Sequence, residues 1–396
     1  MPTFCSFILL DSTLGTGDNM KLEQFRMERM QSTWENVVKY NLSESGVHPV
    51  AIGDLIPEAS DREALLDTEL GYGQSNGTPD LRSLIASMYP GATQSNVMVT
   101  NGTSEANFLV SWLLTEPGDE AVMMAPNYMQ LWGLLRGFGA EVKSFNLIEE
   151  LNWAPDLDQL ESVVSSKTKL IAVCNPNNPT GAILTESEMS RIVESAARVG
   201  AWIVADEVYR GAELDGVMTP SFWGTYDKLI ITSGLSKAYG LPGLRIGWIV
   251  STPETAATAW SYHDYTTIGP SSASDLLARV ALLPENRQKL IARTRKIINS
   301  NYPVLLEWAG QHGKLFSLVD PKAGAIVYLR YNLDINSIEL VERLRQEKSV
   351  LIVPGDHFFM DRYLRIGIGS NAAYLREGLG LVSDGILALR STQAAV

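Results

Sequence analysis

Cysteine is nearly absent from this sequence, which has only Cys5 and Cys174 among its 396 residues. Two cysteines cannot build a disulfide framework and, by themselves, cannot form a structural zinc site. Cys174 ends the apolar run 170–174, where we expect a small buried core residue. The sequence therefore predicts a cytoplasmic protein from a reducing compartment, without a metal site.

Basic residues are in deficit, and long apolar runs are missing. The 32 lysines and arginines face 45 aspartates and glutamates, so the formal net charge is −13. A surface of that sign repels a phosphate backbone, and we expect no nucleic-acid partner. No apolar run approaches the roughly 20 residues that a membrane-spanning helix needs, so we expect no membrane partner.

The N-terminus lacks the marks of a signal peptide. Residues 4–10 are apolar, but no basic segment precedes them and no clean small-residue cleavage pattern follows. We expect residues 1–19 to be a loose extension and the ordered chain to begin near Met20.

Low-complexity tracts and internal repeats are also absent, and short β-branched runs alternate with helical patterns instead. Seven runs are predicted to be strands: 96–100, 120–124, 140–145, 169–174, 202–206, 229–232 and 245–250. Runs that are apolar on both faces and separated by helices are typical of a mostly parallel, covered sheet. The sequence predicts an α/β fold, with a large domain built on a mostly parallel seven-stranded sheet covered by helices on both faces.

The last third of the chain changes character. Helical patterns and short apolar runs alternate there: helices at 285–308, 338–347 and 372–390, strands at 323–328, 350–353 and 363–368. This alternation predicts a smaller α/β C-terminal lobe. We assign an N-terminal arm and small-domain segment to 20–48, the large domain to 49–282 and the small C-terminal domain to 283–396.

The most informative segment is 233–247, Ser-Gly-Leu-Ser-Lys-Ala-Tyr-Gly-Leu-Pro-Gly-Leu-Arg-Ile-Gly. Lys237 lies there between a strand and a turn rich in glycine and proline. A buried amine loses its proton more readily and attacks carbonyl groups, which is how Schiff-base lysines act. Arg245 carries the planar fork of donors that suits a phosphate.

This segment resembles the lysine signature of fold-type-I pyridoxal-phosphate enzymes in the class I/II aminotransferase family. The resemblance extends from about Met20 onward, because further signature segments follow in the family's order. It implies that the large domain binds pyridoxal 5′-phosphate, with Lys237 as its Schiff-base partner and as general base. Asp206 ends an apolar strand, a costly place for a carboxylate without a cation; the resemblance implies that it pairs with the ring nitrogen.

The resemblance also assigns the phosphate contacts. Thr103 and Ser104 follow a glycine turn at a predicted helix start, where free N–H groups and the helix dipole suit a phosphate. Taken alone, they would be ordinary N-caps. Many relatives carry serine or threonine three residues before the lysine, but this chain has Gly234. Ser236, or alternatively Ser233, would then supply a phosphate hydroxyl beside Arg245.

Three further residues are assigned to the ring of the cofactor. Tyr128 follows Pro-Asn at the family's stacking position and would lie flat on the pyridine; core packing is the alternative. The string Asn-Pro-Asn-Asn-Pro-Thr-Gly at 175–181 places Asn178 at the phenolic oxygen of the cofactor. Tyr209 would join it there and is also counted among the catalytic residues.

Substrate contacts follow from two more segments. Arg365, in Tyr-Leu-Arg-Ile-Gly-Ile, resembles the arginine that binds the α-carboxylate through two parallel hydrogen bonds, with Asn178 beside it. Gly46 and Glu44 lie where ordinary aminotransferases have a glycine-rich loop bordering the substrate. Glu44 would either face a cationic substrate side chain or be a solvated loop residue. His357 falls in a loop that often borders the substrate, although a lone histidine is more often structural.

The resemblance leaves the reaction open. An aminotransferase that exchanges an amino group between an amino acid and a 2-oxo acid is predicted first. The segment Ser-Gly-Val-His at 45–48 resembles the branch that includes capreomycidine synthase, so a lyase or cyclase of specialised metabolism, acting by β- or γ-elimination or substitution, is the alternative. A non-catalytic ligand-binding module is a third possibility.

The segment 71–77, Gly-Tyr-Gly-Gln-Ser-Asn-Gly, bears on assembly. It is similar to the family segment that reaches into a neighbouring subunit, which implies that Tyr72 contacts the partner's cofactor phosphate. A homodimer with shared active sites is therefore expected. Without the resemblance, Tyr72 would be read as a surface tyrosine in a glycine turn.

Overall fold

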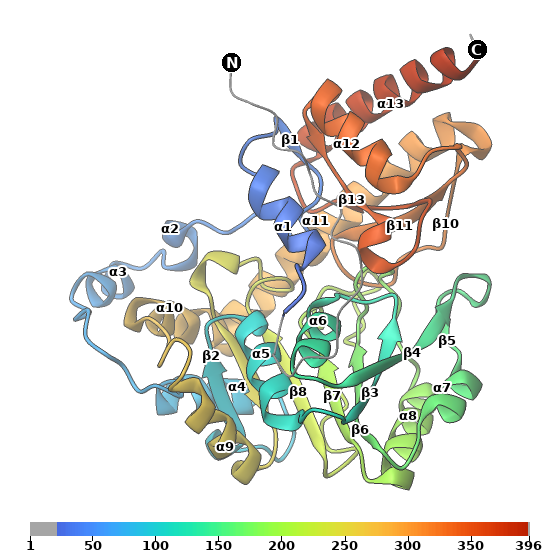
Figure 1. The fold of residues 1–396 in the computed structure, drawn as a ribbon. Coiled ribbons are helices and arrows are strands. Elements are labelled where there is room, and N and C mark those ends of the chain that lie inside the picture. Colours follow the sequence, from blue (N-terminus) through green and yellow to red (C-terminus); the bar gives the residue numbers. More distant parts are fainter. Residues whose placement is uncertain (1–21, 395–396) are drawn as a thin grey trace, which may run out of the picture.

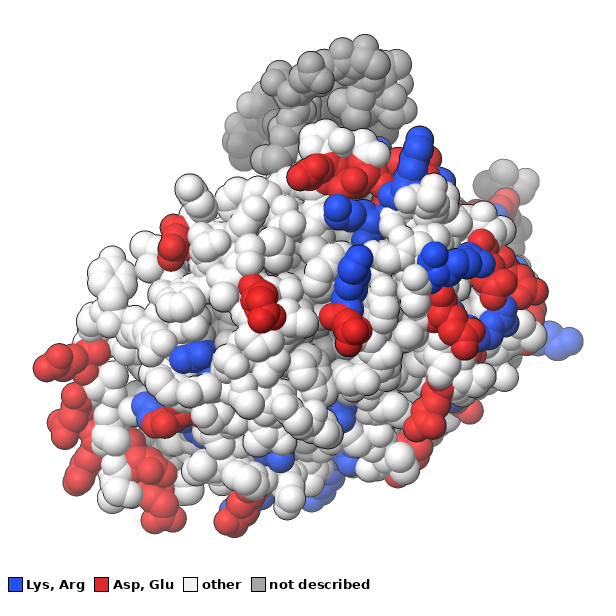
Figure 2. All heavy atoms as spheres, turned by 90° about the horizontal axis from the view of Figure 1, so that it is seen from below, with Lys and Arg blue, Asp and Glu red and all other residues white. Residues whose placement is uncertain are grey.

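The structure is a computed structural model that describes residues 22–394. The loose extension predicted for residues 1–19 lies outside the described residues. The described chain forms two lobes, each built around its own β-sheet (Figure 1). None of the helices within 22–394 is long and apolar enough to cross a membrane. The face seen in Figure 2 carries interspersed acidic and basic side chains.

The large sheet has eight strands in the order β2-β9-β8-β7-β6-β3-β4-β5. They are β2 (Val97–Thr100), β3 (Glu120–Ala125), β4 (Glu141–Ile148), β5 (Ala154–Pro155), β6 (Thr168–Cys174), β7 (Trp202–Asp206), β8 (Leu229–Gly234) and β9 (Gly247–Val250). Neighbours from β4 to β8 pair in parallel, whereas β9 is antiparallel to β8 and β2. The seven predicted strands are present. The predicted count is wrong by one because β5, antiparallel to β4, is too short to show apolar periodicity.

Helices cover both faces of this sheet because its strands are apolar on both. Ile171 and Ile203 belong to one core, while their sequence neighbours Leu170 and Val204 belong to the other, as the period of two in a strand requires. One face is covered by α5 (Thr103–Leu114), α6 (Gln130–Gly137) and α9 (Pro253–His263). The opposite core includes α4 (Pro79–Ala86), α7 (Leu157–Val163), α8 (Glu186–Val199) and α10 (Ser272–Leu282).

The C-terminal lobe has an antiparallel sheet in the order β10-β11-β14-β13. Its elements are α11 (Pro284–Gln311), β10 (Phe316–Leu318), β11 (Ile326–Tyr331), α12 (Ser337–Lys348), β12 (Val350–Leu351), β13 (Val353–Pro354), β14 (Tyr363–Gly367) and α13 (Ala372–Ala394). The three predicted helices and the smaller α/β lobe are present. The prediction lacked β10, and it joined β12 and β13 into one strand.

The N-terminal segment belongs structurally with the far end of the chain. β1 (Tyr40–Asn41) pairs in parallel with β12, and α1 (Arg26–Trp34) lies between the two lobes (Figure 1). The short helices α2 (Ile52–Leu55) and α3 (Ala59–Leu66) then extend along the side of the large lobe. The domain boundaries placed after residues 48 and 282 stay predictions.

Candidate active site

A cavity of about 300 Å³ opens where the carboxyl ends of β6, β7 and β8 meet the start of α5. Open α/β sheets commonly bind ligands at this edge, outside the carboxyl ends of their strands. The remaining wall comes from α1 and from the segment that follows β1. The lining residues are Met27, Glu28, Gln31, Glu35, Glu44, Ser45, Thr103, Ser104, Asn107, Tyr128, Cys174, Asn178, Asp206, Val208, Tyr209, Ser236, Lys237, Pro242 and Arg245.

Asp206 is the last residue of β7 and is 5% exposed. Its carboxylate accepts hydrogen bonds from the Val208 N–H at 3.0 Å and from Asn107 Nδ2 at 3.3 Å. Within residues 22–394, no cation lies within ion-pair distance of it. Burial raises the pKa of Asp206 to about 6, although both hydrogen bonds oppose that rise. A buried carboxylate without a counter-charge suits a cationic ligand group.

Asn107 is a site residue that the sequence reasoning missed. Its Oδ1 accepts a hydrogen bond from Thr232 Oγ1 at 2.8 Å, which turns the amide so that Nδ2 faces Asp206. Asn107 lies four residues after Thr103 on α5. Residues at that spacing share one face of a helix, so this spacing was the available signal.

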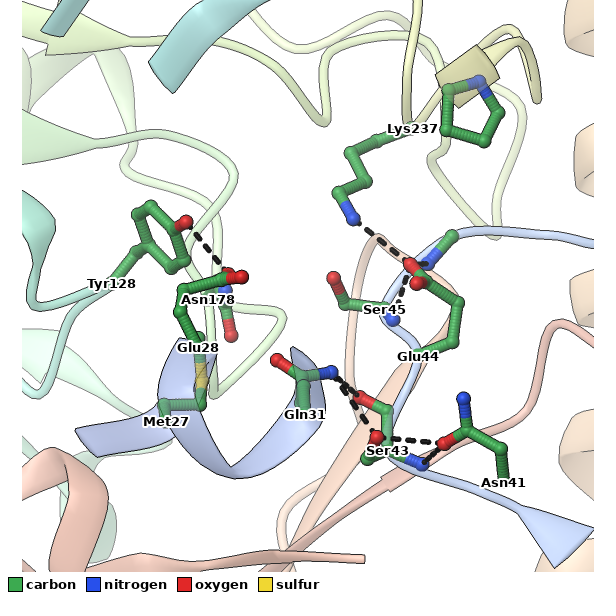
Figure 3. A network of polar contacts seen from close by, with 12 residues as sticks. Met27, Glu28, Gln31, Asn41, Ser43, Glu44, Ser45, Tyr128, Asn178 and Lys237 are labelled. Carbon is green, nitrogen blue, oxygen red and sulfur yellow. Dashed lines mark hydrogen bonds and ion pairs between the residues drawn. The ribbon is translucent and has the colours of Figure 1, made fainter. Parts of the chain in front are cut away.

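Lys237 and Glu44 point toward each other across the cavity and form an ion pair, Nζ to Oε1, at 2.9 Å (Figure 3). The same oxygen accepts the N–H groups of Ser45 at 2.8 Å and Gly46 at 2.9 Å. Lys237 lowers the pKa of Glu44 to about 2, against the opposing effect of burial. The carboxylate is therefore ionised at any physiological pH.

The expectation that burial leaves Lys237 with a weakened hold on its proton is wrong for this state of the protein. Burial does lower the pKa of the lysine, but the Glu44 carboxylate, by its charge and its hydrogen bond, and the nearby Tyr209 raise it by more, so the net direction is upward. Gly46 lies against the lysine stem, since a Cβ placed there would be 3.6 Å from Lys237 Cδ.

The opposite end of the cavity is built for an anion. Thr103 begins α5, and no side chain caps its N–H groups. The buried Thr103 Oγ1 has no hydrogen-bond partner among the described residues. Arg245 passes over Gly102, where a Cβ would lie 2.4 Å from Arg245 Nη2. Glycine with φ +81° is thus required by both the turn and the arginine.

The two serine alternatives are separated by the structure. Ser236 lines the cavity next to Lys237, whereas Ser233 donates to the Glu207 carbonyl at 3.3 Å and is not among the lining residues. Ser236 is therefore the serine placed beside Ser104 and the anion end.

The aromatic and amide residues assigned to the ring are also in the cavity. Tyr128 donates its hydroxyl to Glu28 Oε1 at 2.8 Å (Figure 3), and its ring meets Phe25 edge-on at 5.0 Å. Tyr209 and Asn178 are both buried in the wall. Burial raises the pKa of the Tyr209 hydroxyl, so it holds its proton as a hydrogen-bond donor.

Arg365 lies directly behind the cavity on β14, and it is 1% exposed. Its Nη1 donates to Asn178 Oδ1 at 3.0 Å, and its Nη2 donates to the Ser43 carbonyl at 2.6 Å. That carbonyl also accepts Gln31 Nε2 at 2.9 Å, which fastens α1 over the arginine (Figure 3). The Arg365 Nε has no hydrogen-bond partner among the described residues, so the guanidinium keeps a donor for a carboxylate.

Arg365 and Gly46 are not among the lining residues, and two further predicted residues also lie outside the cavity. Tyr72 is 94% exposed, and the single chain does not bring it to the cavity. His357 lies on the short turn Gly355–Phe358 behind the wall, and burial lowers its pKa to about 4. A neutral, enclosed imidazole there fits the structural reading of His357. Cys174 is buried as predicted.

The residues of the cavity fit pyridoxal 5′-phosphate. An amine, an unpaired buried carboxylate and the start of α5 at Thr103 and Ser104 line one space. Lys237, Asp206 and Thr103 would respectively meet the aldehyde, the ring nitrogen and the phosphate of that molecule.

Comparison with known proteins agrees with this geometry. The model of the family "Aminotransferase class I and II" matches residues 45–381. Capreomycidine synthase from Streptomyces vinaceus is 32% identical over 351 residues, which are 87% of this chain and 89% of that protein. A crystal structure of a PLP-dependent aminotransferase from Streptococcus suis has a TM-score of 0.87 and 33% identity, covering 93% of this chain and 99% of that chain.

A second solved structure is the PLP-dependent cyclase OrfR, with a TM-score of 0.83, 25% identity and coverage of 93% of this chain and 98% of that chain. The matched relatives thus include cyclases as well as aminotransferases. The match of sequence family and fold over most of the length shows that this chain belongs to the class I and II aminotransferases, fold-type-I enzymes that depend on pyridoxal 5′-phosphate.

Proposed function

We propose that this protein acts on an amino acid through Lys237 and is an aminotransferase, exchanging an amino group between that amino acid and a 2-oxo acid. One observation carries the proposal: a single cavity joins the Lys237 amine, the Asp206 carboxylate and the anion end at Thr103. Arg365 is bonded to Asn178, which lines the same space. The family membership supports the same class of chemistry.

The chain offers a separate group for each part of the cofactor. Thr103, Ser104, Ser236 and Arg245 would bind the phosphate, as donors around a helix start. Asp206, oriented by Asn107, would keep the ring nitrogen protonated. When bound, the cofactor supplies an electron sink for the bonds at the substrate's α-carbon.

The other cavity residues would handle the substrate. Lys237 would remove the proton at the α-carbon and return it at the end of the half-reaction, as general base and then general acid. Arg365 would hold the α-carboxylate with Asn178 alongside, through donors that include its unpartnered Nε. Tyr209 would remain a neutral donor to the oxygen substituent on the cofactor ring.

The wall opposite the sheet indicates the substrate class. Glu28 on α1, Glu35 directly after it and Glu44 all line the cavity. Within residues 22–394 the Glu35 carboxylate makes no hydrogen bond or ion pair, and burial, with Glu44 and Glu28 nearby, raises its pKa. These carboxylates would favour an amino acid whose side chain carries a positive charge.

A lyase or cyclase is the second candidate, and Glu44 favours it. Its ionised carboxylate lies 2.9 Å from the lysine amine and raises the pKa of that amine, so it would keep Lys237 protonated to assist the loss of a side-chain substituent. The likeness to capreomycidine synthase and to the cyclase OrfR points the same way.

We also propose a homodimer with shared active sites. Tyr72 extends from the segment between α3 and α4 and cannot serve the cavity of its own chain. Large apolar side chains are exposed on the same stretch, at Leu66 and Leu70, and on Tyr265. A second copy covering them would bring Tyr72 to its neighbour's anion end. A mass of one chain in solution would contradict this arrangement.

The decisive experiment incubates the purified holoprotein with lysine, arginine, their hydroxylated forms and neutral amino acids, with and without a 2-oxo acid. An aminotransferase converts the cofactor to its amine form and turns over only when the 2-oxo acid is present. Turnover without it, with a leaving group or a ring product, identifies the lyase or cyclase. No spectral change with any amino acid contradicts both.

A further inference from the structure

A network of hydrogen bonds lies behind the turn that begins α5, on the side away from the cavity. At its centre is Glu105, the third residue of the helix and buried. Its Oε2 accepts the Asn101 N–H at 2.6 Å and lies 3.1 Å from His263 Nε2. Its Oε1 accepts the hydroxyls of Thr266 at 2.6 Å and Thr267 at 2.8 Å.

Glu105 is held as a carboxylate in this buried place. Burial raises its pKa, but the hydrogen bonds from His263, Thr266 and the Asn101 N–H outweigh that effect and lower it to about 2. His263 is 0% exposed, at the end of α9. The Nε2 of His263 is assigned as the donor because the Glu105 carboxylate can only accept. The Nδ1 of His263 has no hydrogen-bond partner among the described residues.

The network fixes the peptide from which the anion-binding turn starts. Glu105 holds the N–H of Asn101, while Arg245 Nη2 reaches its carbonyl at 3.5 Å. The Asn101 side chain is itself tied to Thr267 Oγ1 at 2.5 Å and to the Gly269 carbonyl at 3.2 Å. The turn that carries Thr103 is therefore clamped on both sides, although Glu105 itself does not line the cavity.

We propose that Glu105 and His263 are positioning residues that set the protein's affinity for the phosphate group of its cofactor. They act through the Asn101 peptide, from which the turn starts that presents the uncapped N–H groups at the beginning of α5 to the anion. This inference rests on the proposed binding of pyridoxal 5′-phosphate in the cavity. It goes further by assigning part of the phosphate affinity to residues that never touch the phosphate.

The test titrates cofactor-free protein with pyridoxal 5′-phosphate and, separately, with pyridoxal, which lacks the phosphate. Binding is followed by the absorbance that develops at Lys237. Loss of a charged hydrogen-bond acceptor corresponds to about ten-fold or more in affinity. Glu105→Gln is expected to weaken pyridoxal 5′-phosphate by that factor and to leave pyridoxal unchanged. His263→Asn is expected to act in the same direction, by less.

Glu120→Gln is the matched control. Glu120 is also a buried carboxylate that accepts serine and threonine hydroxyls, from Ser165 and Thr168, and it pairs with Lys143 at 2.5 Å. It lies at the beginning of β3, the opposite end of the strand from the cavity. Its replacement is expected to lower the melting temperature while leaving the affinity for both ligands unchanged.

Equal weakening of both ligands by Glu105→Gln, or a lower melting temperature with unchanged phosphate affinity, overturns the proposal. If Glu105→Gln fails to fold, Glu105→Asp and His263→Asn provide the same ratio of the two affinities. Wild-type protein that binds neither ligand would instead contradict the proposed function, so the two failures are distinguishable.

Discussion

The two walls of the cavity differ in where their residues come from. The sheet wall takes its polar groups from the ends of strands, as for the buried Asp206, and from the start of α5, as for Thr103. The opposite wall takes Glu28, Glu35 and Glu44 from a short helix and a loop. We therefore expect the first wall to hold the cofactor and the second wall to contact the substrate.

Removing the lysine is the most drastic way to test this division. Lys237→Ala is expected to abolish the absorbance of the bound cofactor and all turnover, whatever the substrate, because no second amine lines the cavity among the described residues. The measurement is the spectrum of protein reconstituted with pyridoxal 5′-phosphate. Lys228→Ala, a change in an exposed lysine that only contacts the Gly200 carbonyl, is the control. An unchanged band in Lys237→Ala would refute the assignment.

Changes in the opposite wall should alter preference instead of abolishing activity. Glu35→Gln is expected to lower kcat/KM for a cationic amino acid about ten-fold, because the substrate's positive side chain would lose one favourable contact with a carboxylate. Activity toward a neutral amino acid of similar length should stay the same. Glu23→Gln provides the control, since Glu23 pairs with Arg136 outside the cavity. An equal decrease in kcat/KM for both substrates would contradict the proposal that the opposite wall determines substrate preference.

Glu44 connects the two walls, and its replacement should change the protonation of Lys237. Because Glu44 raises the pKa of the lysine, Glu44→Gln is expected to lower it and to leave more neutral amine at a given pH. Capture of pyridoxal 5′-phosphate should then speed up at neutral pH, with its pH midpoint displaced downward. Stopped-flow absorbance across a pH series measures this, and a midpoint that stays or rises would contradict the ion pair.

The smallest expected effect concerns the residue after Asp206. Burial raises the pKa of Glu207 to about 7, and its carboxyl group accepts bonds from Ser221 and from the Phe222 N–H. The folded state thus keeps its proton when the unfolded state has lost it. The contribution of Glu207 to the free energy of unfolding is therefore fully present below pH 4.5 and is lost as the pH rises toward 7.

In cofactor-free protein, the free energy of unfolding should fall less between pH 4.5 and 7.5 in Glu207→Gln than in the wild type, by roughly 1–3 kcal/mol. Urea denaturation at both pH values measures the difference in unfolding free energy. If wild type and variant lose stability in parallel, Glu207 is not the group that titrates.

The sequence predicted the sheet wall far better than the opposite wall, for a physical reason. Buried parallel strands are continuous apolar runs, so a carboxylate such as Asp206 at the end of one stands out, and Lys237 lies in a distinctive glycine-rich turn. The pairs Glu44–Lys237 and Glu105–His263 join residues 193 and 158 positions apart. Contacts over such separations leave no periodic trace, and β10 was likewise too short to detect.

The pairing of β1 with β12 has a mechanical consequence for the lysine. On either side of Glu44, the backbone is bonded to the C-terminal lobe: Leu42 N–H to the Leu351 carbonyl at 2.8 Å and His48 N–H to the Gly369 carbonyl at 2.8 Å. Lys237, by contrast, rides on the large lobe after β8. A hinge movement that separated the two lobes would therefore move the Glu44 carboxylate away from the Lys237 amine. Because Glu44 raises the pKa of that amine, the same movement would make Lys237 easier to deprotonate.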